Sequence, residues 1–132
     1  MPSSDKPLRV LVVDDCADTT ALMSSMLRRR GHTASTAATA AAALSLFEEP
    51  AGWHLVLVDC GLPDLDGLEL ARRLRASSPQ VSIVAVTGNS RDQDRAAAIS
   101  AGCDDFVSKP LGRQRLDALL ARAASRSAAS DP

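Results

Sequence analysis

Three aspartates, Asp14, Asp15 and Asp59, stand directly after short apolar runs of this chain. The runs, residues 9–13 and 55–58, have the length and composition of buried β-strands. The carboxyl ends of parallel strands lie at one edge of an open α/β sheet, where such sheets place their ligands. We therefore expect the three carboxylates to converge at that edge.

Carboxylates that are brought together repel one another by about 4 kcal/mol for each close pair in a partly exposed site. Protonation or a cation would relieve this repulsion, and oxygen ligands with room left for water and phosphate are typical of Mg²⁺. Two further strand ends carry Thr87 and Lys109, which add a hydroxyl donor and a positive charge. Since phosphoryl transfer needs a nucleophile, a metal and donors to the phosphoryl oxygens, the pattern indicates that Asp59 accepts a phosphoryl group.

Strand-like and helix-like segments alternate along the chain. The expected strands are residues 9–13, 32–36, 55–58, 81–86 and 105–107, and the expected helices are residues 18–30, 39–49, 67–76, 91–100 and 112–126. This alternation favours the α/β class, with a single doubly wound (βα)5 domain and a parallel sheet covered by helices on both faces. A flavodoxin-like strand order of 2-1-3-4-5 would place the first and third strands side by side.

The domain itself is expected to span residues 8–124. Residues 1–7 are interpreted as a flexible lead-in, and residues 125–132 as a flexible tail or a truncated linker. In the first helix, Leu22, Met26 and Arg30 form one row and Met23 and Leu27 form a neighbouring one, so the apolar stripe has helical spacing.

The composition argues against several classes of protein. Lys and Arg number 15 against 16 Asp and Glu, so no basic patch indicates direct binding to nucleic acid. The three cysteines are scattered and odd in number, which fits a reducing compartment. Because no signal-peptide pattern and no long apolar span are present, we expect a cytoplasmic domain without membrane contact.

The motifs and their order resemble the receiver domain of response regulators in two-component phosphorelay systems. The resemblance covers residues 8–123 and rests on five elements, Asp14-Asp15, Asp59 with Leu62-Pro63, Asp66-Gly67, Thr87-Gly88 and Lys109-Pro110. Residues 59–63 and 68–75 are similar in particular to receivers attached to hybrid sensor kinases.

The resemblance implies that Asp59 is the phosphoacceptor and takes its phosphoryl group from a phosphohistidine. The donor would be a histidine kinase or a histidine phosphotransfer protein, while the output protein or attached domain stays unknown. It also implies that Mg²⁺, or Mn²⁺ in its place, is bound by Asp14, Asp15, Asp59 and the backbone carbonyl of Gly61.

The resemblance further implies that Thr87 and Lys109 contact the phosphoryl oxygens. Phe106 matches the switch aromatic of the family, which moves inward as Thr87 is drawn to the phosphate. The change would then reach the face formed by the fourth helix, the fifth strand and the fifth helix. The bond between Lys109 and Pro110 is expected to be cis by the same resemblance, and Phe106 is expected to be half-buried at the surface.

Two other functions stay open beside a signalling phosphoacceptor that is not a turnover enzyme. A phosphatase that forms an aspartyl phosphate usually carries a second Asp two residues after the nucleophile, where this chain has Gly61. A docking module that is never phosphorylated would not need an intact acidic triad together with Lys109.

The histidines and two of the cysteines complete the set of candidates. His32 and His54 are expected to be solvated loop residues, since neither has a His or Cys partner at metal-binding spacing. Cys16 and Cys60 each follow a site aspartate. They are interpreted as small, partly buried thiols, with a redox role in phosphorylation as the alternative.

Overall fold

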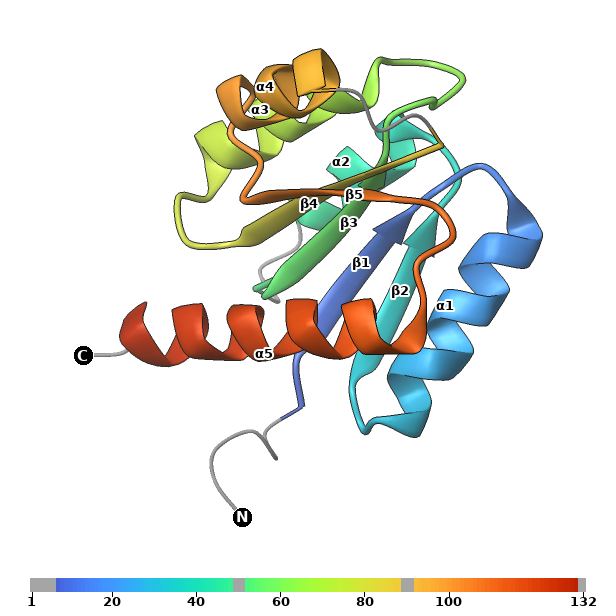
Figure 1. Ribbon diagram of the computed structural model, residues 1–132, viewed down its shortest axis with the longest axis vertical. Helices are drawn as coiled ribbons and strands as arrows, with labels where there is room; N and C mark the ends of the chain where they lie inside the picture. Colours follow the sequence, from blue (N-terminus) through green and yellow to red (C-terminus); the bar gives the residue numbers. More distant parts are fainter. Residues whose placement is uncertain (1–6, 49–51, 89–91, 131–132) are drawn as a thin grey trace.

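The computed structural model describes residues 7–48, 52–88 and 92–130, and Figure 1 shows a twisted sheet with helices on both faces. In these residues the strands are β1 (Arg9–Val13), β2 (Thr33–Ala37), β3 (Leu55–Asp59), β4 (Ser82–Thr87) and β5 (Asp105–Ser108). The helices are α1 (Ala17–Arg29), α2 (Ala40–Phe47), α3 (Gly67–Ser77), α4 (Asp92–Ser100) and α5 (Arg113–Ser130). All neighbouring strands are parallel in the order β2-β1-β3-β4-β5, so the predicted fold class and strand order are confirmed.

Alternating residues of the strands build one apolar core on each face of the sheet. Helices α1 and α5 cover one face (Figure 1). On this face Leu27 and Leu116 pack in the cluster that contains Val12. Helices α2, α3 and α4 cover the other face, where Leu74 packs in the cluster that contains Val56. Because every residue of β3 is buried, its sequence is a continuous apolar run rather than an alternating one.

The register of the central strands sets the position of the acidic residues. Val13 at the end of β1 pairs with Val58 of β3, so Asp14 and Asp59 follow side by side at the same edge of the sheet. Strand β5 ends at the same edge, and Lys109 follows it directly. The topology therefore brings residues that are far apart in the sequence to one place.

Most predicted boundaries lie within two residues of the observed ones, and the predicted boundaries at residues 49 and 91 fall outside the described residues. The predicted end of the last helix at residue 126 is wrong, because α5 continues through residues 127–130 to Ser130. No Gly or Pro interrupts this segment, and Arg126 holds it to the domain by hydrogen bonds to the carbonyls of Pro79 and Gln80.

Leu22 belongs to the predicted apolar stripe of α1 but does not face the sheet. Its side chain is 59% exposed, whereas Met23, Met26 and Leu27 form the buried face of α1. None of the helices in the described parts of the chain is both long and apolar enough to span a bilayer.

Candidate functional site

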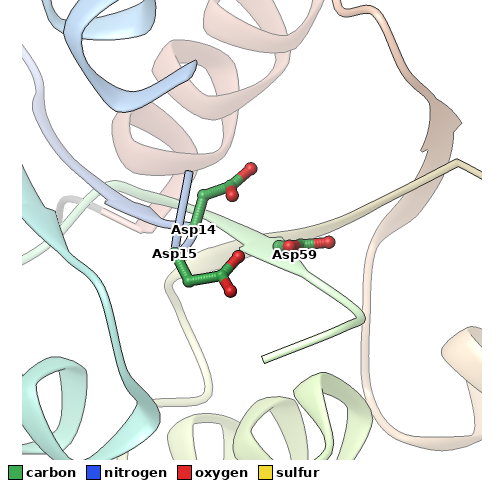
Figure 2. A group of neighbouring side chains, drawn as sticks. All are labelled: Asp14, Asp15 and Asp59. Carbon is green, nitrogen blue, oxygen red and sulfur yellow. The ribbon is translucent and has the colours of Figure 1, made fainter. Parts of the chain in front are cut away.

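The acidic cluster forms where β1 and β3 end. Asp14, Asp15 and Asp59 each bring an oxygen atom to within 4.8 Å of those of the other two (Figure 2). Asp14 and Asp59 are buried, with 5% and 8% of their surface exposed, and Asp15 is exposed to solvent. The structure thus brings together the three carboxylates that the strand pattern predicts to converge.

Backbone hydrogen bonds hold the two buried carboxylates in place. Oδ1 of Asp14 accepts the N–H of Cys16 at 2.9 Å, and Oδ1 of Asp59 accepts the N–H of Gly61 at 3.2 Å. Each aspartate therefore bonds to the chain two residues further on, as short acidic side chains do in turns. The N–H of Asp14 in addition donates to the carbonyl of Ala37 at the end of β2, at 3.0 Å.

Lys109 places its ammonium group between the two buried carboxylates. Its Nζ lies 3.1 Å from Oδ2 of Asp14 and 3.4 Å from Oδ1 of Asp59. Burial by itself lowers the pKa of Lys109, but the hydrogen bonds and negative charges of the two aspartates outweigh this and raise the pKa above its usual value. Lys109 is therefore a fixed positive charge in the site. The peptide bond between Lys109 and Pro110 is cis, as the resemblance implies.

Thr87 and Phe106 lie on the same face of the sheet in adjacent strands. Thr87 pairs with Ser108, and Phe106 pairs with Ala85 two residues earlier on β4, so the side chains of Thr87 and Phe106 point to the same side. The expectation that Phe106 is half-buried is wrong, because only 2% of its surface is exposed. The guanidinium of Arg95 on α4 lies 5.5 Å from the centre of its ring.

The start of α3 packs directly on the backbone of the candidate acceptor. A Cβ atom at Gly67 would overlap the carbonyl oxygen of Asp59 and would lie 2.7 Å from the Cα of Cys60. The N–H of Gly67 donates to the carbonyl of Cys60 at 3.2 Å, and Asp66 caps the helix by accepting the N–H of Leu68 at 2.8 Å. This contact gives a physical reason for the Asp66-Gly67 pair.

Sequence reasoning missed one residue of this region, Asp64. Its two carboxylate oxygens accept the N–H groups of Ala40 and Ala41 at the start of α2, at 2.9 and 3.0 Å. The partners lie 24 and 23 residues away in the chain, so no local spacing could have indicated the contact.

A cavity of about 170 Å³ opens beside the acidic cluster. Asp14, Asp59 and Lys109 line it together with apolar side chains of α1, the central strands and the segment after β5. The exposed Leu22 is one of the lining residues, so its outward orientation places it next to the site rather than in the core.

The cysteines near the site differ in burial. Cys60 is partly buried, as interpreted, but the same interpretation is wrong for Cys16, which is exposed. Burial, with the negative charge of Asp59 as a smaller cause, raises the pKa of the Cys60 thiol to about 11. Cys60 is therefore a protonated and poorly nucleophilic thiol at neutral pH, which favours the interpretation of a structural role.

The histidines lie at the opposite edge of the sheet, and the expectation that they are solvated is wrong. His32 and His54 are half-buried, and their Nδ1 atoms accept the N–H groups of Leu8 and Arg9 at 3.0 and 2.9 Å. Burial lowers the pKa of both imidazoles, with the charge of a nearby arginine as a further cause. Both side chains therefore serve as hydrogen-bond acceptors for the start of β1.

The donors in the acidic cluster fit a hard divalent cation. They are carboxylate oxygens close enough to share one ion, and Asp15 is exposed, which leaves one side of the cluster open to water or a ligand. The nearby Lys109 and the cavity beside it supply a positive charge and space for an anionic group.

Comparison with known proteins identifies relatives over almost the whole chain. The family model described as the response regulator receiver domain matches residues 10–121. The chain is 32% identical over 119 residues to the hybrid signal transduction histidine kinase L of Dictyostelium discoideum, covering 85% of this chain and 7% of that protein. It is 34% identical over 121 residues to the probable transcriptional regulatory protein TcrX of Mycobacterium tuberculosis, covering 89% of this chain and 51% of that protein.

A solved structure with the same fold is a response regulator protein from Burkholderia pseudomallei, described with a phosphorylated aspartic acid, a calcium ion and citrate. It matches with a TM-score of 0.81 and 27% identity over 92% of this chain and 71% of that one. The chain spans about half or less of the length of the two sequence relatives, so it corresponds to one domain of each.

Proposed function

Because this chain belongs to the family of response regulator receiver domains, we propose that Asp59 accepts a phosphoryl group in a two-component signalling pathway. Receiver domains are signalling modules rather than classical enzymes. The observation that carries the proposal is the position of Asp59, which is buried at the end of β3, shares one site with the other two carboxylates and contacts the ammonium group of Lys109. The phosphorylated aspartic acid of the Burkholderia pseudomallei protein supports it.

The proposed reaction is an in-line transfer from a phosphohistidine. A carboxylate oxygen of Asp59 attacks phosphorus, the P–N bond of the donor breaks, and its electron pair returns to the imidazole nitrogen, which then binds a proton. Lys109 lies 3.4 Å from the attacking carboxylate and is placed to pair with the phosphoryl oxygens. Bound Mg²⁺ would offset the negative charge of the carboxylates and of the phosphoryl group.

The residues proposed to hold the metal are Asp14, Asp15, Asp59 and the backbone carbonyl of Gly61. The three carboxylates already share one site, and the N–H of Gly61 binds Asp59, which keeps this residue beside the cluster. Mn²⁺ has the same preference for oxygen ligands and is expected to replace Mg²⁺.

The proposed relay runs from Thr87 through Phe106 to α4 and α5. Thr87 would bind the phosphoryl group, and Phe106 would follow it on the same face of the sheet. Arg95 of α4 donates to the carbonyl of Phe106 at 3.2 Å. Arg122 of α5 pairs with Asp105, the residue before Phe106, at 3.0 Å. A movement of Phe106 would therefore act on contacts made by both helices.

We propose that the donor is a histidine kinase or a histidine phosphotransfer protein in the cytoplasm. The similarity to a hybrid histidine kinase and to a transcriptional regulator fits either a receiver within a larger protein or a separate regulator. Neither relative identifies the output partner of this chain.

Incubation with acetyl phosphate and Mg²⁺ tests the proposal. We expect the intact mass to rise by one phosphoryl group in the wild type and in Asp117→Asn, a matched change at an exposed carboxylate of α5. Asp59→Asn should show no increase. An unmodified wild-type protein would contradict the proposal, and turnover of a small phosphate ester would favour a phosphatase instead.

A further inference from the structure

The N-terminus of α2 is capped by two residues from different parts of the chain. Thr39, directly before the helix, accepts the N–H of Ala42 through Oγ1 at 3.1 Å. Asp64, in the loop between β3 and α3, accepts the N–H groups of Ala40 and Ala41 at 2.9 and 3.0 Å. The N–H groups of the first three helical residues therefore have hydrogen-bond partners, and the carboxylate of Asp64 accepts two of these three bonds.

The loop that carries Asp64 begins at the candidate acceptor. Its first part contains Gly61, whose N–H binds Oδ1 of Asp59 at 3.2 Å. Its far end is fixed by Gly67, which packs on the backbone of Asp59. Between these ends, Leu62 and Leu65 are only half-buried against the core. Asp64 adds two directional hydrogen bonds to this loop, from an element outside it.

The connection from β2 to α2 also contacts the segment after β1, which carries Asp14. The carbonyl of Ala37 accepts the N–H of Asp14 at 3.0 Å, and Ala40 and Ala41, a few residues later, bind Asp64. The connection from β2 to α2 thus contacts both segments that carry candidate metal ligands. A displacement of the β3–α3 loop from α2 would change the position of Gly61 relative to Asp14.

We propose that Asp64 is a positioning residue that holds the β3–α3 loop against α2 and so sets the affinity of the acidic site for Mg²⁺. The inference rests on the proposed function, since it concerns the metal site of the same domain. A carboxylate at a helix N-terminus is favoured by the helix dipole, and charge-assisted bonds to N–H groups are stronger than neutral ones. The two backbone bonds accordingly lower the pKa of Asp64, which keeps it ionised at neutral pH.

The chain offers a matched control, because Asp64→Ala and Thr39→Ala each remove a cap from α2 but only the first releases the loop. Calorimetric titration with Mg²⁺ and no phosphodonor gives a readout that is independent of phosphorylation. Loss of residues that orient metal ligands typically costs 10-fold to 100-fold in metal affinity, so we expect Asp64→Ala to weaken Mg²⁺ binding by about 10-fold. Thr39→Ala should leave the affinity within about 2-fold of the wild type, because it keeps the loop contact.

Two further measurements distinguish a positioning role of Asp64 from an effect of its charge and from a loss of folding. Asp64→Asn keeps one oxygen acceptor without the charge, so we expect an affinity between those of the wild type and Asp64→Ala. Amide hydrogen exchange without metal should accelerate at Gly61 in Asp64→Ala, but not in Thr39→Ala, while the exchange of β3 stays slow in both and shows that the fold is intact.

Three results would overturn the inference: wild-type affinity in Asp64→Ala, an equal loss in Thr39→Ala, or no Mg²⁺ binding by the wild type. The proposed function fails separately, if the wild type binds Mg²⁺ but acquires no phosphoryl group at Asp59.

Discussion

The backbone of Gly67 at the start of α3 packs directly on the backbone of Asp59 at the end of β3. No room is left for a side chain between them, because a Cβ atom at Gly67 would overlap the carbonyl oxygen of Asp59. The helix that follows the acceptor therefore begins against the acceptor itself. The position of the Asp59 carboxylate depends on this contact as well as on its strand.

Substitution of Gly67→Ala tests this relationship. The added methyl group must push α3 away from β3, at a cost of about 1–3 kcal/mol in the free energy of unfolding. We expect slower phosphorylation of Asp59 as well, since the carboxylate moves with its backbone. Gly112→Ala is the control, because a Cβ atom there meets no atom within 4 Å. Equal behaviour of the two variants in denaturant unfolding and in acetyl phosphate labelling would disprove the packing argument.

Removal of the charge at Lys109 should have opposite effects on the affinity for Mg²⁺ and on the rate of phosphorylation. In Lys109→Met the ammonium that lies 3.1 Å from Asp14 and 3.4 Å from Asp59 is lost. We expect tighter Mg²⁺ binding, because a competing positive charge has gone, and slower phosphorylation, because the phosphoryl oxygens lose a partner. Arg115→Met at an exposed position of α5 should change neither quantity. Weaker Mg²⁺ binding in Lys109→Met would argue against this electrostatic account.

Stability should fall with acid because of His32 and His54. The folded pKa of each is lowered from 6.5, mainly by burial, so the unfolded chain binds the protons more readily. Their contribution to stability is therefore complete above about pH 6.5 and is lost as the pH falls through the lower folded values. Protonated Nδ1 atoms could no longer accept the N–H groups of Leu8 and Arg9.

Denaturant unfolding between about pH 8 and pH 5.5 measures this effect. The double variant His32→Gln/His54→Gln has amide groups that do not titrate in this range. Its free energy of unfolding should depend on pH less steeply than that of the wild type. Identical slopes would show that the histidines are not responsible.

The relay can be followed by fluorine NMR, because the chain contains only two phenylalanines, Phe47 and Phe106. In protein labelled with fluorophenylalanine, the resonance of Phe106 should shift when acetyl phosphate is added, while that of Phe47 on α2 stays in place. Thr87→Ala should still accept the phosphoryl group but leave the Phe106 resonance where it was. A full shift in Thr87→Ala would remove Thr87 from the relay.

The sequence predicts the parts of this site that depend on strand ends. Asp14, Asp15 and Asp59 follow apolar runs, and a parallel sheet of the predicted order must bring such residues to one edge. Lys109 could be placed at the same edge for the same reason. These predictions need only the class of the fold and the end of each strand, which a run of buried residues marks clearly.

Contacts between distant segments could not be predicted in the same way. The bonds of Asp64 to α2 and of His54 to Arg9 join residues that are 23 to 45 positions apart in the chain. They depend on how the loops fold over the sheet. The burial of Phe106 depends on how α4 packs on β5, which its own short strand does not reveal. The outward position of Leu22 depends on how α1 is rotated about its own axis. The helical spacing of its apolar residues does not determine this rotation.

The central claim, that Asp59 is the phosphoacceptor, is tested most directly by mapping the adduct. Borohydride reduces an aspartyl phosphate to homoserine, so the modified residue can be identified by peptide mass spectrometry after treatment with acetyl phosphate and Mg²⁺. We predict homoserine at position 59 and unmodified Asp14, Asp15 and Asp64. Homoserine at another aspartate, or at none, would contradict the account.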